Sequence, residues 1–560
     1  MAGAADGEPE PLIDAEMRRA NRLRRLLLTS AGTAASAVAF VLYARIDWPW
    51  VVLGWIGLIP WLVALDRTQT LRGALGAGWL MCELFVLAVF AWLPNAIQNY
   101  TGAPWAVAFC VVVLVAPLLQ PQFMAFALTR QLARRQTNTV WRPTLVGACA
   151  YVGTEWIFPK LFADTLGHGL YASLLLRQGA DLAGAHGLTF VLIIANECML
   201  AVLTRITRGG ARVHGRALSS AFAPLACAVS LVVALLVYGA VRCQQVDAGR
   251  ADDRIAVGIV QADITHYGEL AAQMGTYGAA RLILDTHYAL SGEALKRGSV
   301  ALLVWPETVY PTTFGAPKSE DGAAFDREIG GFAAQNGVPL VFGAYDTDGS
   351  DEFNAAFFLQ PGADGRVTVE AYRKAAPFPL TERVPAWLDS EAVRRWLPWL
   401  GTWRPGTGGQ VVSLTLRDGR TVRVAPLICY DALFSRYAIA AAGQGAEMIV
   451  TISNDSWFSF GNVPRLILVI SAFRSIETRR PQVRATNTGI SAVIGPTGEL
   501  AGTIGVHQRA ASVAFLTPER RTTTLMLAWG DWFGPAALIA GGVLLVAPSI
   551  AGRVRGRSRR

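Results

Sequence analysis

The sequence predicts an all-α membrane domain joined to an α/β layered domain that lies outside the bilayer. The 560-residue chain is 52% hydrophobic with a mean hydropathy of +0.35, too apolar for an ordinary water-soluble protein. Long apolar runs fill its first 242 residues and its end, and a long polar segment lies between them. In that polar segment short apolar strands alternate with helical patterns, which is typical of an α/β domain.

Eight apolar runs are candidate membrane spans, several of them close to the roughly 20 residues that a helix needs to cross a bilayer. The runs are Leu26–Tyr43, Trp50–Leu65, Ala77–Leu93, Trp105–Leu128, Thr144–Phe158, Leu188–Leu203, Leu218–Val241 and Phe533–Ile550. The second and fifth are short enough to be re-entrant or interfacial. More spans follow the first, so we expect it to be a retained anchor rather than a signal peptide.

Arginines cluster in every second connection, which predicts eight spans with both termini in the cytoplasm. The clusters are Arg18, Arg19, Arg22, Arg24 and Arg25; Arg67 and Arg72; Arg130, Arg134, Arg135 and Arg142; Arg205, Arg208, Arg212 and Arg216; and Arg553, Arg555, Arg557, Arg559 and Arg560. Together these 20 residues exceed the net charge of +9, so the rest of the chain is net negative. The basic charge therefore follows membrane topology, and a nucleic-acid partner is excluded.

This pattern divides the chain into three parts. Residues 1–242 form a membrane domain of about seven helices, residues 243–532 an extracytoplasmic domain, and residues 533–560 a last span with a basic cytoplasmic tail. The middle part is long enough to bury a core of its own. Of the seven cysteines only Cys429 lies well inside it. An unpaired thiol in an oxidising compartment is a liability unless it is buried or used.

Strands and helices alternate through the polar segment. The expected strands are Arg254–Gln261, Val300–Glu307, Pro339–Tyr345, Val422–Ile428 and Met448–Ile452, the expected helices include Thr276–Leu295 and Phe325–Asn336, and the segments Phe353–Leu359 and Val367–Tyr372 read as a hairpin. The hairpin makes the sheets mixed.

Three of these strands end in residues that can do chemistry: Glu307, Cys429 and the pair Asn454-Asp455. Lys374 follows the hairpin, in a chain with only four lysines. A carboxylate can accept a thiol proton, and an ammonium can stabilise the oxyanion formed when a thiolate attacks an acyl carbonyl. Taken singly, however, Cys429 also fits a core cysteine, Lys374 a solvated loop lysine and Glu307 a salt-bridge partner.

Several stretches together resemble the nitrilase (carbon–nitrogen hydrolase) superfamily, and specifically its membrane-bound branch, the apolipoprotein N-acyltransferase family. They are Val304-Trp-Pro-Glu-Thr308, Pro377-Phe378 with Glu382 and Val384-Pro385, Pro426-Leu-Ile-Cys-Tyr430, Thr451-Ile-Ser-Asn-Asp455 with Trp457-Phe458, Arg484-Ala-Thr-Asn-Thr-Gly-Ile-Ser491, and Gly530-Asp-Trp-Phe533. The resemblance covers the whole polar segment and the layout of the spans.

The resemblance implies an αββα sandwich with a Glu–Lys–Cys triad: Cys429 as nucleophile, Glu307 as general base and Lys374 as oxyanion stabiliser. It also implies that Glu382 positions Lys374 or relays a proton. Tyr430 and Asp431 match the positions that shape the acyl site. No metal or other cofactor is implied.

The reaction implied by the resemblance is ping-pong acyl transfer. Cys429 takes an acyl chain from a phospholipid as a thioester, and the α-amine of diacylglyceryl-cysteine on an apolipoprotein then attacks it. The implied setting is the bacterial inner membrane, with the catalytic domain on the periplasmic side and the protein a monomer.

The sequence departs from the family pattern in several places, one of which is the lack of a Trp soon after Gln261, where Tyr267 is the nearest comparable aromatic residue. Asp431 stands where the family more usually has Glu. Asn462-Val-Pro-Arg-Leu-Ile467 replaces a Gly-Pro-x-Gln-His stretch, and Glu155-Trp-Ile-Phe-Pro-Lys160 with Asp164-Thr-Leu-Gly167 replaces Arg-Gly and Gly-Phe-Pro-Trp elements. None of them touches the triad residues.

Alternative functions are a membrane-tethered amidase or nitrilase that uses water, a divergent acyltransferase, an inactive lipoprotein-binding module and a transporter. Asn196 and Glu197, inside the sixth span, are either a functional polar pair or a helix–helix contact. The stretch Pro379–Trp403 contains Trp387, Trp396, Trp399 and Trp403. It is either a membrane-facing lid or a segment packed on its own domain.

Overall fold

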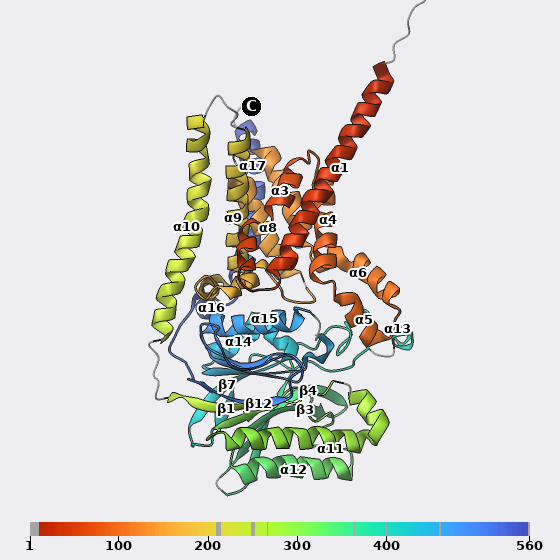
Figure 1. Cartoon of the computed structure of the whole chain (residues 1–560), viewed down its shortest axis with the longest axis vertical. Coiled ribbons are helices and arrows are strands. Elements are labelled where there is room, and N and C mark those ends of the chain that lie inside the picture. The colour runs from red at the N-terminus through yellow and green to blue at the C-terminus, as the bar shows by residue number, and fades with distance from the viewer. Residues whose placement is uncertain are drawn as a thin grey trace, which may run out of the picture.

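The computed structural model describes residues 10–557, apart from 138, 140, 159, 209–213, 248–252, 266, 363, 398–399 and 459–460. A helical part and a layered α/β part lie end to end along the long axis of the molecule (Figure 1). Of the residues discussed above, Arg212, Trp399, Arg559 and Arg560 lie outside the described ranges.

The helical part is formed by both ends of the chain. Its elements are α1 (Glu10–Tyr43), η1 (Trp50–Val52), α2 (Leu53–Ile56), α3 (Ile59–Asp66), α4 (Leu71–Val89), α5 (Leu93–Thr101), α6 (Trp105–Leu119), α7 (Gln122–Gln136), α8 (Trp141–Ile157), η2 (Leu166–Ala172), η3 (Leu176–Gly179), α9 (Ala180–Arg208), α10 (His214–Asp247) and α17 (Phe533–Arg557). Helix α17 packs on α8, which returns the end of the chain to the bundle.

The predicted number of eight spans is not confirmed. Over the described residues, four helices are long and apolar enough to cross a membrane, or five if the bent pair α6 and α7 is one span. The predicted span Trp50–Leu65 is divided among η1, α2 and α3. The span Trp105–Leu128 bends by 43° where α6 ends and Pro121 precedes α7. Proline lacks the amide N–H that would continue the helical hydrogen bonds.

Asn196 and Glu197 make helix–helix contacts. The Asn196 side chain donates to the carbonyl of Gly54 and accepts from the N–H of Leu58, which ties α9 to α2 and the start of α3. Glu197 pairs with Arg130 of α7 at 2.5 Å. Both side chains therefore have protein partners inside the bundle, as the helix–helix hypothesis requires.

Two six-stranded mixed sheets form the α/β part. The first has the order β12 (Ala510–Leu516), β1 (Ile255–Gln261), β2 (Leu302–Val304), β3 (Leu340–Asp348), β4 (Asp351–Pro361) and β5 (Val367–Arg373). The second has the order β11 (Leu500–Ile504), β10 (Ser491–Ile494), β9 (Gln482–Thr486), β8 (Met448–Ser453), β7 (Thr421–Ile428) and β6 (Val412–Thr415). In each sheet three neighbouring strands are parallel: β1–β3 and β7–β9.

The sheets lie face to face between two layers of helices, as expected. Val257 and Val304 of the first sheet share a core with Val424 and Val450 of the second. Helices α11 (Tyr267–Lys296) and α12 (Glu320–Asn336) cover the outer face of the first sheet, and α14 (Ser435–Gly443) and α15 (Val463–Thr478) lie on the second (Figure 1). Strand β1 is buried along its whole length, which explains why its residues before Gln261 carry no polar side chain.

Helix α15 connects this sandwich to the membrane helices. It packs against α9, and all but two of its sixteen residues are buried. Beyond its end Arg479, in the left-handed conformation with φ +53°, donates to Asp181 at 2.7 Å. Asp181 also accepts from Tyr238 and Arg242 of α10. Helix α10 itself continues to Asp247, past the predicted boundary at 242.

The candidate lid contains one short helix, α13 (Glu391–Trp396). Trp387 and Trp396 are 84% and 87% exposed, so they do not pack on the domain. Trp403 does pack on it, with its ring 4.5 Å from that of Tyr345. The exposure of Trp387 and Trp396 is what a membrane-facing lid needs. The contact of Trp403 with Tyr345 is what a segment packed on its own domain needs.

Candidate active site

Cys429 lies at the carboxyl end of β7, the first residue of the short helix η5 (Cys429–Leu433). Its φ of +47° is in the left-handed region, which non-glycine residues rarely adopt and which is common at functional sites. Strand β7 lies between β6, to which it is antiparallel, and β8, to which it is parallel, so the thiol is held at the end of a strand that is paired on both sides. The backbone of Cys429 is therefore strained, and the direction of its side chain is fixed by the strand.

Glu307 and Lys374 come from the other sheet, where β2 and β5 end. The Lys374 ammonium lies 2.9 Å from Glu307 Oε1 and 2.9 Å from Glu382 Oε1. Lys374 is 2% exposed and Glu307 5%. A buried ammonium between two carboxylates is paired on both sides, which is the condition for keeping such charges away from water.

The Glu307 carboxylate accepts hydrogen bonds from residues in or directly after strands of both sheets. Oε1 accepts from Asn354 Nδ2 at 2.7 Å, and Oε2 accepts from the backbone N–H of Asn454 at 2.8 Å. Asn454 follows β8, a neighbour of the cysteine-bearing strand. The bond therefore connects Glu307 to the sheet that carries Cys429.

The charges of the site act on one another. Burial raises the pKa of Glu307, against the opposing effect of Lys374. Burial alone would lower the pKa of Lys374, but Glu307 and Glu382 raise it well above its usual value. Burial and Glu307 raise the pKa of the Cys429 thiol, while Lys374 lowers it. Lys374 is therefore charged, and Cys429, whose pKa is raised, would have to give up its proton to act as a nucleophile.

Glu382 is positioned as a second carboxylate beside Lys374. Its Oε1 also accepts from Asn354 Nδ2 at 3.0 Å, and its Oε2 accepts from the N–H of Phe378 at 2.6 Å. The role of positioning Lys374 fits these contacts directly. Asn354 was not anticipated from the sequence, although it is a polar residue within the apolar strand β4.

The Asp431 side chain lies in the protein interior, two residues after Cys429. It is fully buried, and its oxygens accept from the N–H groups of Ala376 at 2.7 Å and Ile428 at 3.1 Å and from the hydroxyl of Tyr372 at 3.0 Å. Burial raises its pKa to about 6. Since Tyr372 and Ala376 flank Lys374, the carboxylate joins the Lys374 segment to the strand that carries Cys429.

Tyr430 connects the nucleophile to the membrane helices. Its hydroxyl donates to the carbonyl of Leu161, in the loop after α8, at 2.7 Å. Its ring lies 4.9 Å from that of Phe378 and 5.1 Å from that of Phe434. These aromatic rings form an apolar wall next to Cys429, suited to an acyl chain.

Asp455, at the third predicted strand end, also raises the pKa of the Cys429 thiol, although its ion pair is with another residue. It pairs with Arg484 at 2.7 Å, and Ser453 donates to it at 2.6 Å. No group of three or more His, Cys, Asp or Glu side chains in the described ranges is arranged to hold a metal ion.

Two family models match the chain. The one described as Carbon-nitrogen hydrolase matches residues 257–523, and the one described as Apolipoprotein N-acyltransferase N-terminal domain matches residues 35–198. Among solved structures, an amidase from Nesterenkonia sp. is similar at 20% identity and a TM-score of 0.32, over 48% of this chain and 91% of that one. Nit3 of Saccharomyces cerevisiae is similar at 17% identity and a TM-score of 0.33, also over 48% and 91%.

Curated relatives align with most of the chain, and those reported below are named Apolipoprotein N-acyltransferase. The protein from Geobacter metallireducens is 28% identical over 82% of this chain and 84% of its own. The one from Bdellovibrio bacteriovorus is 25% identical over 89% and 90%, and the one from Gloeobacter violaceus 28% identical over 91% and 92%. With one family model on its membrane helices, another on its sandwich and such relatives along most of its length, the chain matches the apolipoprotein N-acyltransferase family from the membrane helices through the sandwich.

Proposed function

We propose that the protein transfers an acyl chain from a membrane phospholipid to the N-terminal amine of diacylglyceryl-cysteine on apolipoproteins. The observation that carries the proposal is the buried Glu307–Lys374–Glu382 cluster at the strand ends that meet Cys429. The family match supports the acyl-transfer chemistry, and the apolar helices support a membrane location.

In the first half-reaction the Cys429 sulfur attacks the ester carbonyl of the phospholipid, and Glu307 takes the thiol proton. Lys374 lies where its charge can stabilise the oxyanion. When the tetrahedral intermediate collapses, the C–O bond breaks and Glu307 returns the proton to the leaving lysophospholipid oxygen. A thioester remains on Cys429.

In the second half-reaction the amine of the diacylglyceryl-cysteine attacks the thioester carbon, and Glu307 takes a proton from the amine. The C–S bond breaks, the amide forms, and the thiolate regains the proton. Water must be kept from the thioester throughout, and the aromatic wall of Phe378, Tyr430 and Phe434 can help to exclude it.

Both substrates are anchored in a bilayer, so we place the site at a membrane surface. The arginine clusters support cytoplasmic termini and a periplasmic sandwich. The proposed domain boundaries remain near residues 242 and 532, and the proposed assembly is a monomer. The lid proposal for Pro379–Trp403 rests on the exposed Trp387 and Trp396.

A labelled-lipid assay tests this function. The membrane protein is incubated with a phospholipid that carries a radiolabelled acyl chain and with a diacylglyceryl lipopeptide. We expect a triacylated peptide and a hydroxylamine-labile label on the protein, both abolished by Cys429→Ser. Cys243→Ser, which removes another cysteine side chain, is the matched control and keeps both signals. A triacylated product from Cys429→Ser would refute the mechanism, and release of fatty acid alone would favour a hydrolase.

A further inference from the structure

Two of the sequence departures from the family pattern meet at one cavity in the membrane-facing half of the molecule. The cavity has a volume of about 260 Å³. Its lining includes Asp164, from the segment after α8, and Asn462, from the segment that opens α15. It contains none of Glu307, Lys374 or Cys429, so it is distinct from the proposed chemical centre.

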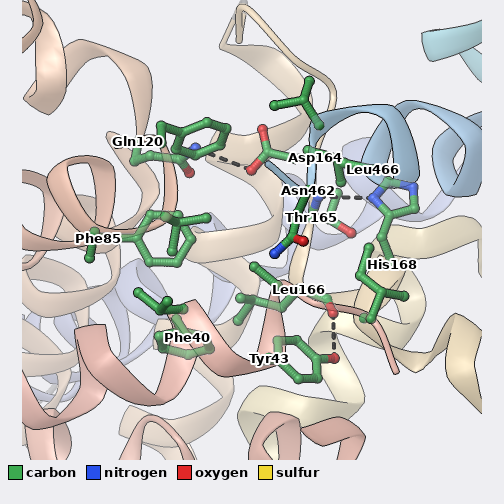
Figure 2. Close-up of a pocket in the computed structure, with 18 of the residues that line it drawn as sticks. Phe40, Tyr43, Phe85, Gln120, Asp164, Thr165, Leu166, His168, Asn462 and Leu466 are labelled. Atoms are coloured by element: carbon green, nitrogen blue, oxygen red, sulfur yellow. Dashed lines mark hydrogen bonds between the residues drawn. The ribbon is translucent and has the colours of Figure 1, made fainter. Parts of the chain in front are cut away.

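The cavity is amphipathic. Aromatic rings, among them Phe40 and Phe85, form one part of the wall, and Figure 2 shows the polar side chains of Gln120, Asp164 and Asn462 facing the same space. Asn462 occupies the N-cap position of α15 but makes no capping hydrogen bond with its side chain, which leaves the amide turned to the cavity. An amphipathic cavity of this kind suits a ligand with a polar head and an apolar tail.

The charge of the cavity is acidic. Its described lining contains the carboxylates of Asp164 and Glu155 but no Lys or Arg side chain. Lys160, outside the lining, pairs with Glu155 at 3.3 Å and with Asp164 at 3.4 Å, so it offsets one of the two negative charges. His168, also in the lining, accepts from the Thr165 N–H through Nδ1, so its ring is neutral in this arrangement. The two carboxylates at this apolar space thus share a single ammonium.

Glu155 provides a second, independent sign of a missing partner. It is 6% exposed, and its Oε2 is buried without a hydrogen-bond partner among the described residues. A buried acceptor without a donor is costly, and a bound donor would remove that cost. Carboxylates surrounded by aromatic rings favour a cation, since the faces of the rings also attract positive charge.

We propose that this cavity binds the primary ammonium group of a membrane amphiphile, with Asp164 and Glu155 as its counter-charges. The inference rests on the proposed function only for the choice of a lipid as the ligand. An aminophospholipid and the free amine of the lipopeptide acceptor share this chemistry. The first turn of α15 lines the same cavity, and helix N-termini favour phosphate, so we expect the aminophospholipid to bind more tightly.

The test measures lipid binding to the full-length Cys429→Ser protein, which cannot form the thioester, by native mass spectrometry in detergent. The probes are short-chain phosphatidylethanolamine, its N-acetylated analogue, and the lipopeptide with a free or an acetylated amine. We expect the free-amine phospholipid to bind about tenfold more tightly than its acetylated form, the difference that one charge-assisted contact provides. A preference for the free amine in the lipopeptide pair alone would identify the acceptor as the ligand.

Substitutions locate the binding. Asp164→Asn should erase the preference for the free amine. Glu83→Gln should keep it, because Glu83 is also 6% exposed in the bundle but does not line the cavity. If Asp164→Asn lowers the melting temperature too far for the measurement, Asn462→Leu at an exposed position replaces it and should weaken binding.

Equal binding of free and acetylated amines, as expected if the cavity holds only water, would overturn the inference. So would a preference that survives Asp164→Asn or, where Asn462→Leu replaces that variant, free-amine lipid binding as tight as in the Cys429→Ser protein alone. Thioester formation by the unmodified protein is measured separately, so failure of this inference and failure of the proposed acyl transfer give different results.

Discussion

At the scale of single residues, the site depends on how burial and charge set the protonation of three side chains. Glu307 is buried beside Lys374, and its carboxylate has a raised pKa but three hydrogen-bond donors. Those donors favour the ionised form, in which Glu307 can act as a base. Lys374, with its raised pKa, stays charged over the whole range in which the protein is expected to work.

This balance predicts a pH dependence. A carboxyl group with a raised pKa keeps its proton to a higher pH than an ordinary glutamate, and a protonated Glu307 cannot accept the thiol proton. We therefore expect thioester formation to be lost as the pH falls, with a midpoint above the ordinary glutamate value of 4.5. The measurement is the initial rate of protein labelling from the acylated phospholipid across the acidic range. A rate that stays constant down to that value would contradict the assignment of Glu307 as the base.

At the scale of elements, the important contact is the one between the ends of β5 and β7. Lys374 directly follows one strand and Cys429 the other, and the two strands belong to different sheets. The Asp431 carboxylate bridges them through backbone N–H groups on both sides. Each sheet is rigid, so this bridge sets the position of the ammonium relative to the thiol.

Replacing Asp431 tests the bridge. In Asp431→Asn one carboxylate oxygen becomes an NH₂ group, which faces N–H donors and cannot accept from them. We expect a loss of about 1–3 kcal/mol in the free energy of unfolding, the cost of leaving such a buried donor unsatisfied. We also expect at least a tenfold slower thioester formation in the folded fraction, because Lys374 is displaced.

The control for this prediction is Asp326→Asn, which removes a carboxylate that accepts from the Gly315 N–H far from the cysteine. It should lower stability without slowing thioester formation per folded molecule. Equal rates in the two variants would show that Asp431 has only a structural role.

At the scale of the whole molecule, a buried ionic cluster joins the sandwich to the bundle. Asp181 at the start of α9 and Arg479 after α15 are both fully buried, and Tyr238 and Arg242 of α10 bind the same carboxylate. Removing one partner of a buried pair leaves the other charge without compensation. The cluster therefore couples the neighbouring helices α9 and α10 to α15, which lies far away in the sequence.

Asp181→Asn should destabilise the junction by about 3–5 kcal/mol, as for other broken buried ion pairs. The measurement is thermal unfolding in detergent, together with limited proteolysis near residues 248–252. Glu293→Gln in α11, which weakens the exposed pair with Arg297, is the control and should cost much less. Unchanged unfolding of Asp181→Asn would show that apolar packing of α15 alone holds the two parts together.

The sequence by itself determined much of this protein, because the relevant signals are local. Apolar strands that stop at Glu307 and Cys429 predicted the α/β domain, and the spacing of apolar residues predicted strands and helices close to those observed. Glu307, Lys374, Cys429 and Glu382 could be named because each lies in a short, recognisable stretch.

The tertiary structure alone decided the features that depend on contacts between distant segments. The number of spans could not be read from apolar runs, since proline and packing break Trp50–Leu65 and Trp105–Leu128 into shorter helices. Asn354 could be assigned to the site only from the structure, in which β4 lies beside Lys374. The bridging contacts of Asp431 likewise depend on the position of one sheet relative to the other. Hydrogen bonds between segments dozens of residues apart leave no periodic trace in a sequence, and only folding brings their partners within reach.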